Sequence, residues 1–363
     1  MSSENLQVVC RAPPAACDVA PLSRSGTHLR DRAAPFPRRL CATATVQSGI
    51  RLPGGATVGG AAPCYVWITD SGARGTVTGS ACLCITFQAP SSRRDLGPLP
   101  DPAWRQPGVK VLHIADLDYE TTCVRFVSCL EQVRGCSDAN PRHVPLLILL
   151  ELKQSDRRAV EQGGVVAPPW NAAALDGLDA EIRSVFGEDD MITPDDVRRS
   201  ALTLEQSVRE HGWPTLRQSR GKVAFLLDNE PGSLREAYIA GRPSLEGRVI
   251  FTNSRPGQPD AAFVKRNEPR EANTAQIQEL VRQGYLVRTR SDLPVSTVRT
   301  GDTSLLDAAL RSGAHVVSTD FPEVGMSARY GSDFVARLPE GGPARCNPVN
   351  ARRPCRSDRL EPR

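Results

Sequence analysis

The 363-residue sequence contains no long hydrophobic run. Its longest apolar stretch, Val144 to Leu150, has the length of a core strand and falls well short of the ~18 residues that a membrane-spanning helix needs. Glycine and proline are frequent but follow no period, which excludes a collagen-like or coiled-coil chain. A net charge of +4 with 40% hydrophobic residues excludes disorder throughout. The chain is long enough for one large domain or for two of ~150 residues each.

The first 94 residues lack lysine and have almost no aromatic side chains. They hold ten Arg against three Asp and one Glu, so the basic character of the chain is confined to this segment. Such a charge balance can indicate nucleic-acid binding. However, these arginines are scattered and almost no aromatic residues are present to stack on bases, so we predict that the chain does not bind nucleic acid. The segment also lacks a zinc-type Cys-x-x-Cys pair, and its start lacks the basic and apolar regions of a secretory signal peptide.

Two cysteines near the carboxyl terminus, Cys346 and Cys355, bracket a short polar loop. This spacing predicts a disulfide clip and therefore an oxidising compartment. Two free thiols in a frayed tail are the alternative. Cys123 and Cys129 could form a second bridge, which would leave Cys136 unpaired.

Strand-like and helix-like segments alternate from residue 95 onward. Strands are predicted at residues 109–114, 144–152, 222–228, 248–253, 285–290 and 315–320, and the main helices at 123–137, 172–186, 275–283 and 304–312. This alternation predicts an α/β fold, namely a TIM-like (β/α) barrel that is incomplete or distorted at its first two strands. The predicted division is an atypical Arg/Pro/Cys-rich segment (1–94), the barrel (95–335) and a carboxyl-terminal tail with the clip (336–363).

Polar residues follow several of the predicted strands, and the carboxyl ends of barrel strands meet at one mouth. Glu151 and Lys153 lie at the end of the strand at 144–152, directly after Leu146–Leu150, and because they are two residues apart they point the same way. A carboxylate there suits Ca²⁺ or Mg²⁺, and an ammonium beside it suits a phosphate. A salt-bridged pair with only a structural role is the alternative. Asp228 and Arg288 also lie where strands end.

His113 is the candidate for acid/base catalysis, because it lies in an apolar strand that is followed by Asp116 and Asp118. A histidine in such a strand can equally be a core residue. The other histidines of this part of the chain suit catalysis less, because two flank helix ends or loops and one begins its strand at the wrong end; these are His143, His211 and His315.

Many segments after Lys110 resemble the calcium-dependent, phosphatidylinositol-specific phospholipase C family of bacteria, in matching order over roughly residues 96–350. The matching segments include Val111–Tyr119, Pro145–Lys153, Ile192–Val197, Gly212–Leu216, Pro243–Arg248, Gly284–Arg290 and Val317–Pro322.

The resemblance implies a barrel that cleaves phosphoinositide lipid to diacylglycerol and inositol phosphate. In the family the inositol 2-hydroxyl attacks phosphorus, two histidines act as base and acid, and Ca²⁺ stabilises the phosphate charge. His113 matches the second histidine, Glu151 a calcium ligand, and Lys153 a phosphate-facing lysine. Asp228 and Arg288 are added as substrate-binding candidates because they end strands. The resemblance also implies a secreted protein, and we expect a monomer with transient, peripheral membrane contact.

The sequence departs from the family at its start. The family's His-Asn-Ser-Tyr-His motif is missing after Leu6–Val9, as is a Glu-Leu-Asp sequence on the second strand, which predicts impaired catalysis. A frame-shifted reading of a GC-rich gene over residues 10–94 would produce this composition. Two other functions remain open: a glycerophosphodiester phosphodiesterase, and a non-catalytic pseudoenzyme that binds phosphate or lipid.

Overall fold

The structure is a computed structural model of the whole chain. It describes residues 6–9, 67–68, 84–85, 87–88, 101–112, 120–121, 123–153, 157–161, 166–293, 295–322, 324–339, 342 and 344–360. Before residue 101, and at residues 120, 158 and 159, only the backbone is described.

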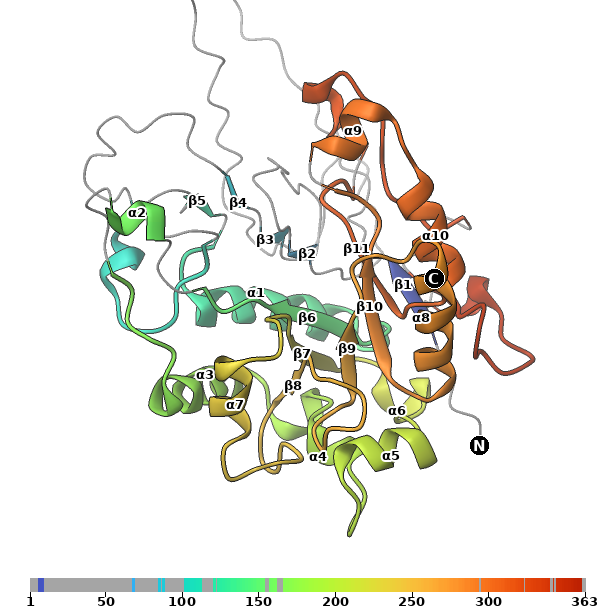
Figure 1. Cartoon of the computed structure of the whole chain (residues 1–363). Helices are drawn as coiled ribbons and strands as arrows, with labels where there is room; N and C mark the ends of the chain where they lie inside the picture. The colour runs from blue at the N-terminus through green and yellow to red at the C-terminus, as the bar shows by residue number, and fades with distance from the viewer. Residues whose placement is uncertain are drawn as a thin grey trace, which may run out of the picture.

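The fold is mixed α/β with mostly parallel strands (Figure 1). One sheet has the order β6 (Leu146–Leu150), β7 (Val223–Leu227) and β8 (Ile250–Thr252). A second sheet has the order β9 (Phe263–Lys265), β10 (Leu286–Arg290), β11 (Val316–Ser318), β1 (Leu6–Val9) and β12 (Ala344–Cys346). Neighbours are parallel except for β12, which runs antiparallel to β1.

The two sheets meet at a single parallel bridge between Asn253 and Phe263. The described strands therefore trace one arc in the order β6 to β11, then β1 and β12. Among the described strands, two short pairs are not hydrogen-bonded to these sheets. They are β2 (Trp67–Ile68) with β3 (Cys84–Ile85), and β4 (Phe87–Gln88) with β5 (Glu120–Thr121). Within the described residues the arc does not close into a ring.

Helices occupy most of the crossovers between parallel strands. Their bounds are α1 (Phe126–Ala139), α2 (Arg157–Glu161), α3 (Ala172–Val185), α4 (Pro194–Val197), α5 (Leu204–Glu210), α6 (Leu216–Ser219), α7 (Ser233–Ile239), α8 (Ala272–Arg282), α9 (Ser296–Thr300) and α10 (Ser304–Ser312). Short 3-10 helices lie at Pro102–Arg105, Glu188–Asp190, Ala328–Tyr330 and Ser357–Arg359. Figure 1 shows α8 and α10 side by side along β10, and α1 packs against α3. No helix in this described set is long and apolar enough to cross a bilayer.

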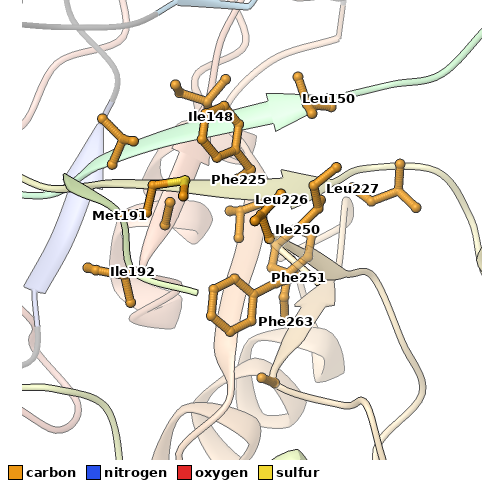
Figure 2. Packing of buried hydrophobic residues seen from close by; sticks show 14 of the residues in the cluster. Ile148, Leu150, Met191, Ile192, Phe225, Leu226, Leu227, Ile250, Phe251 and Phe263 are labelled. Atoms are coloured by element: carbon orange, nitrogen blue, oxygen red, sulfur yellow. The ribbon is translucent and has the colours of Figure 1, made fainter. Parts of the chain in front are cut away.

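The core forms around the central strands because their sequences are apolar without interruption. Every residue of β7 is buried, as expected for a parallel strand covered on both sides. Figure 2 shows Phe225 of β7 close to Ile148 of β6, and Phe251 of β8 beside Phe263 of β9. Side chains from both sheets thus join one hydrophobic core across the bridge between β8 and β9.

Local sequence signals set several helix ends. Asn171 caps α3, because its side chain accepts a hydrogen bond from the Ala174 amide. Thr193 and Asp196 form the capping box of α4, which begins at Pro194.

Two details of the predicted strand pattern are wrong. Residues 109–112 do not form a barrel strand: Lys110 makes an antiparallel bridge to Arg125, and Val111 donates a hydrogen bond to the Val124 carbonyl. This segment folds back on the residues just before α1 because they are its nearest backbone partners. The second error is an omission, since β9 was not predicted and no helix separates it from β8.

Disulfides join Cys123 to Cys129 and Cys346 to Cys355. Cys136 is also disulfide-bonded, so the expectation that it stays unpaired is wrong. It is almost completely buried on α1, and its partner is a cysteine other than these four. The clip that contains Cys346 follows β12 directly and lies at the start of β1, because Leu6 pairs with Cys346.

Candidate functional site at the carboxyl ends of the parallel strands

The strand register assigns the side chains of the arc to two faces. Residues paired across parallel strands share a face, and so do alternate residues along one strand. The following pairs therefore share one face, here called the inner face: Leu149–Leu226, Leu226–Phe251, Asn253–Phe263, Phe263–Leu286 and Lys265–Arg288. Near the strand ends this face becomes charged.

Five charged side chains lie on the inner face near this edge, and we call them the mouth cluster: Glu151, Lys153, Asp228, Lys265 and Arg288. The expectation that Arg288 ends its strand is wrong, because it is the middle residue of β10, opposite Lys265 at the end of β9. The amide of Asp228 donates to the Leu150 carbonyl at 2.8 Å, so the ladder between β6 and β7 continues past both strands and sets Glu151 next to Asp228. Glu151, Lys153, Asp228 and Arg288, the described residues among the predicted site residues, thus lie on the same face, and their roles stay predictions.

Glu151 and Lys153 form an ion pair, with 2.6 Å between Oε2 and Nζ. About a third of each side chain is exposed, so the pair faces solvent in part. The carbonyl of Lys153 accepts a hydrogen bond from the indole Nε1–H of Trp170 at 3.0 Å. This contact ties the end of β6 to the segment that leads into α3.

Asp228 lies between two cations. Its Oδ2 is 3.6 Å from Lys265 Nζ and 3.6 Å from Arg288 Nη1, and all three side chains are nearly buried. Lys265 also pairs with the exposed Glu230 at 3.0 Å, and Arg288 Nη1 donates to Asn267 Oδ1 at 2.6 Å. The Nε of Arg288 is buried and has no hydrogen-bond partner among the described residues. The set offers a carboxylate acceptor between ammonium and guanidinium donors.

Two further charged groups near this edge have shifted pKa values. Burial lowers the pKa of Arg266, and the nearby Glu230 opposes this shift. Burial raises the pKa of Asp292, although hydrogen bonds from Ser291 and Thr319 favour its charged form. Asp292 also accepts a hydrogen bond from the Asp320 amide at 3.0 Å, so it joins the chain after β10 to the chain after β11.

The mouth cluster, as described, does not fit a calcium ion. Ca²⁺ takes six to eight oxygen ligands, whereas the Glu151 carboxylate is bound by Lys153 and the Asp228 carboxylate by two cations. In the part of the chain that the structure describes, no three His, Cys, Asp or Glu side chains come together as a metal site.

His113 lies outside the described residues, and so do Asp116, Asp118 and His28. The histidines that the sequence disfavours are located away from the mouth or in the core. Burial lowers the pKa of both His143 and His315. His143 contacts Ser137 Oγ at 2.8 Å. His315 directly precedes β11, and its Nδ1 accepts a hydrogen bond from the amide of Val287 in β10. His211 is the exposed residue that ends α5.

Sequence reasoning missed Lys265. A weak signal exists for it, because it follows the short apolar run Ala261–Val264 much as Glu151 follows β6. Asn229 and Asn253 are among the polar residues that follow predicted strands, but the sequence assigns them no role of their own, since their contacts depend on which strands lie side by side.

The chain matches the family model described as Phosphoinositide phospholipase C, Ca2+-dependent, over residues 86–348. The chain belongs to this family. The match begins near the end of the atypical first segment and includes every member of the mouth cluster, and the family predicted from the sequence is confirmed.

Solved phospholipases of this kind are also similar to the chain. A calcium-dependent phosphoinositol-specific phospholipase C from a Pseudomonas species is 16% identical, with 61% of this chain and 71% of that chain covered and a TM-score of 0.40. A Ca²⁺-dependent phosphatidylinositol-specific phospholipase C from Streptomyces antibioticus is 18% identical, with 56% and 72% covered and a TM-score of 0.38. No curated protein sequence matches the chain.

Proposed function

We propose that this phospholipase C family member binds the head group of a phosphoinositide lipid at the mouth cluster and cleaves it to diacylglycerol and inositol phosphate. The observation that carries the proposal is that Lys153, Lys265 and Arg288 share one face with two carboxylates, near the ends of β6, β7 and β9 and beside the middle of β10. Cations in such a site hold phosphate oxygens, and a carboxylate flanked by donors suits the hydroxyls of a polyol ring.

In the proposed reaction, the inositol 2-hydroxyl attacks phosphorus while a base takes its proton. The bond from phosphorus to the diacylglycerol oxygen breaks, and an acid returns a proton to that oxygen. In this proposal the Lys153 ammonium holds the phosphate. Glu151 would keep this ammonium in place until the phosphate arrives, since the two groups are in contact. We assign an acid/base role to His113 from the family resemblance.

Several finer features belong to the same proposal. The strand order suits a (β/α) barrel whose first two strands depart from the family pattern. In this proposal the chain consists of an atypical first segment (1–94), the barrel (95–335) and a carboxyl-terminal tail (336–363). The disulfides suit an oxidising compartment, in line with a secreted monomer that touches the membrane surface transiently. Calcium follows from the family's description alone, and the mouth cluster supports no step that depends on it.

A second function is favoured by one observation, namely that both mouth carboxylates are already bound by cations. A site of this kind can hold an anionic head group without turnover, as a pseudoenzyme would. This alternative and the proposed hydrolysis share the same ligand.

The test combines an activity assay with calorimetry. Phosphatidylinositol vesicles and glycerophosphoinositol are each incubated with the protein, with Ca²⁺ or with a chelator, and released inositol phosphate, free inositol and glycerol phosphate are measured. Calorimetry with inositol phosphate compares Lys153→Gln with Lys222→Gln, because Lys222 is a half-buried lysine at the opposite end of β7 whose Nζ donates to the Met191 carbonyl.

We expect release from intact lipid, with binding weakened about 10–100-fold by Lys153→Gln and left unchanged by Lys222→Gln. Binding without release from either substrate favours the pseudoenzyme. Release from glycerophosphoinositol alone favours the glycerophosphodiesterase. Equal binding by both lysine variants contradicts the assignment of the site.

A further inference from the structure

The mouth cluster is divided between two sheets. Glu151, Lys153 and Asp228 follow strands of the first sheet, whereas Lys265 and Arg288 belong to the second. Between β8 and β9 the backbone ladder is reduced to the bridge at Asn253 and a hydrogen bond from the Ser254 amide to the Phe263 carbonyl. A site built across so short a ladder needs other contacts to fix its two halves.

The side chain of Asn253 supplies such a contact. Its Nδ2 donates to the Asn229 carbonyl at 3.1 Å, and its Oδ1 accepts from the Lys265 amide at 2.9 Å. Asn253 is 2% exposed, so these bonds are shielded from water. One amide side chain therefore joins the end of β7 to the end of β9 across the intervening strand.

The side chain of Asn229 continues the connection to β6. Its Oδ1 accepts from the Leu152 amide at 2.8 Å, and its Nδ2 donates to the Leu152 carbonyl at 3.0 Å. Leu152 lies between Glu151 and Lys153 in sequence. Asn229 thus holds the backbone of the residue that separates the two charged side chains of β6.

We propose that Asn229 and Asn253 are positioning residues that set the spacing within the mouth cluster. Asn229 sets the spacing between the Glu151–Lys153 pair and Asp228, and Asn253 sets the spacing between the ends of β7 and β9, which carry Asp228 and Lys265. The inference rests on the proposed function for its ligand. Because a displacement of 1 Å in a positioned group can cost ~100-fold in rate, four hydrogen bonds that fix this spacing matter for head-group recognition. Neither residue needs to touch the substrate.

Aspartate variants test the proposal because they keep the shape of each side chain. In Asn229→Asp and Asn253→Asp a carboxylate oxygen replaces the NH₂ group and lies against a backbone carbonyl, so one hydrogen bond becomes a repulsion. Asn347→Asp is the matched control. Asn347 is also 2% exposed, donates to the Gly313 carbonyl at 2.7 Å and accepts from the Val349 amide at 2.9 Å, at the opposite edge of the sheet.

Two readouts are measured well below each variant's unfolding temperature. The first is the affinity for myo-inositol phosphate by calorimetry. The second is the indole N–H resonance of Trp170, assigned with Trp170→Phe, because this group donates to the Lys153 carbonyl and so reports the position of the β6 end without any ligand.

We expect all three variants to lose similar thermal stability, but only Asn229→Asp and Asn253→Asp to lose about tenfold or more in affinity. The Trp170 resonance should move in Asn229→Asp and stay in place in Asn347→Asp. Unchanged affinity and an unchanged Trp170 resonance in the two mouth variants would overturn the proposal. If the wild-type protein binds no inositol phosphate, the proposed function fails, whereas the Trp170 resonance still decides whether Asn229 positions the β6 end.

Discussion

Asp228 is the residue on which the charge balance of the mouth depends. Asparagine at this position keeps the shape of the side chain but removes the negative charge that Lys265 and Arg288 share. The two cations then lie close together without a carboxylate between them, and the three side chains are at most 12% exposed. Since breaking a buried ion pair costs more than the pair contributes, Asp228→Asn should lower the free energy of unfolding by about 2–4 kcal/mol, with Glu230 offsetting part of the loss.

Urea unfolding measures this change, and Asp358→Asn is the control. Asp358 pairs with Arg356 at 2.8 Å, but both side chains are more than half exposed, so its substitution should leave stability unchanged. Equal stability of the two variants would show that the Asp228 group is not a buried ionic cluster.

His315 predicts a dependence of stability on pH. Burial lowers its pKa to about 4, and the neutral ring accepts a hydrogen bond from the Val287 amide. The unfolded chain takes up a proton as the pH falls below ~6.5, whereas the folded protein does so only near pH 4. The contribution of His315 is therefore complete above pH ~6.5 and is lost as the pH falls toward 4.

Replacing His315 with Asn keeps an acceptor and removes this proton uptake. Between pH 7 and pH 4 the wild-type protein should lose on the order of 3 kcal/mol more stability than His315→Asn. Chemical unfolding at a series of pH values gives the comparison. Parallel curves for the two proteins would mean that His315 titrates normally in the folded state. The pKa of His143 is also lowered by burial, so some acid sensitivity should remain in the variant.

At the level of elements, α8 ends where its sequence predicts because Gly284 allows the chain to turn. Gly284 has φ of +98°, and a Cβ there would lie 2.3 Å from the Val208 carbonyl oxygen. Gly284→Ala should therefore cost about 3 kcal/mol, from both the left-handed backbone and the clash. Gly241→Ala separates these causes, because Gly241 has φ of +74° but nothing within 4 Å, and should cost about 1 kcal/mol.

Thermal or urea unfolding of the two glycine variants provides the measurement. Similar losses would mean that the chain after α8 moves away from Val208 at little cost. The predicted result would show that α8 and α5 are held together at this point.

At the scale of the whole molecule, we expect the atypical first segment to impair catalysis, because it lacks the family's His-Asn-Ser-Tyr-His motif. A protein in which residues 10–94 are replaced by the sequence of another reading frame at the same locus should release inositol phosphate at least ~100-fold faster than this chain, because acid/base partners contribute that much. The lipid assay measures the difference. A locus whose other frames lack His-Asn-Ser-Tyr-His would contradict the frame-shift hypothesis.

The sequence predicted the strands and helices that have long, unbroken signals. β6 and β7 are continuous apolar runs, and α10 has its predicted bounds, from Ser304 to Ser312. β9 escaped prediction because three residues are too few to show a period. Glu151, Lys153 and Asp228 could be singled out because they directly follow such strands, whereas Arg288 is the middle residue of β10.

The contacts among those residues could not be predicted. The Lys265–Asp228–Arg288 group and the amide contacts of Asn229 and Asn253 depend on the register between neighbouring strands. Register is set by tertiary packing, and a sequence pattern fixes only which residues share a face of one strand.

The placement of β1 between β11 and β12 bears on how the protein is made. Val8 pairs with both Val316 and Ala344, which a ribosome adds some three hundred residues later. At translation rates of about 5–20 residues per second, the first strand waits on the order of tens of seconds for its neighbours. Because this pairing joins residues so far apart in sequence, we expect refolding in vitro to be slow.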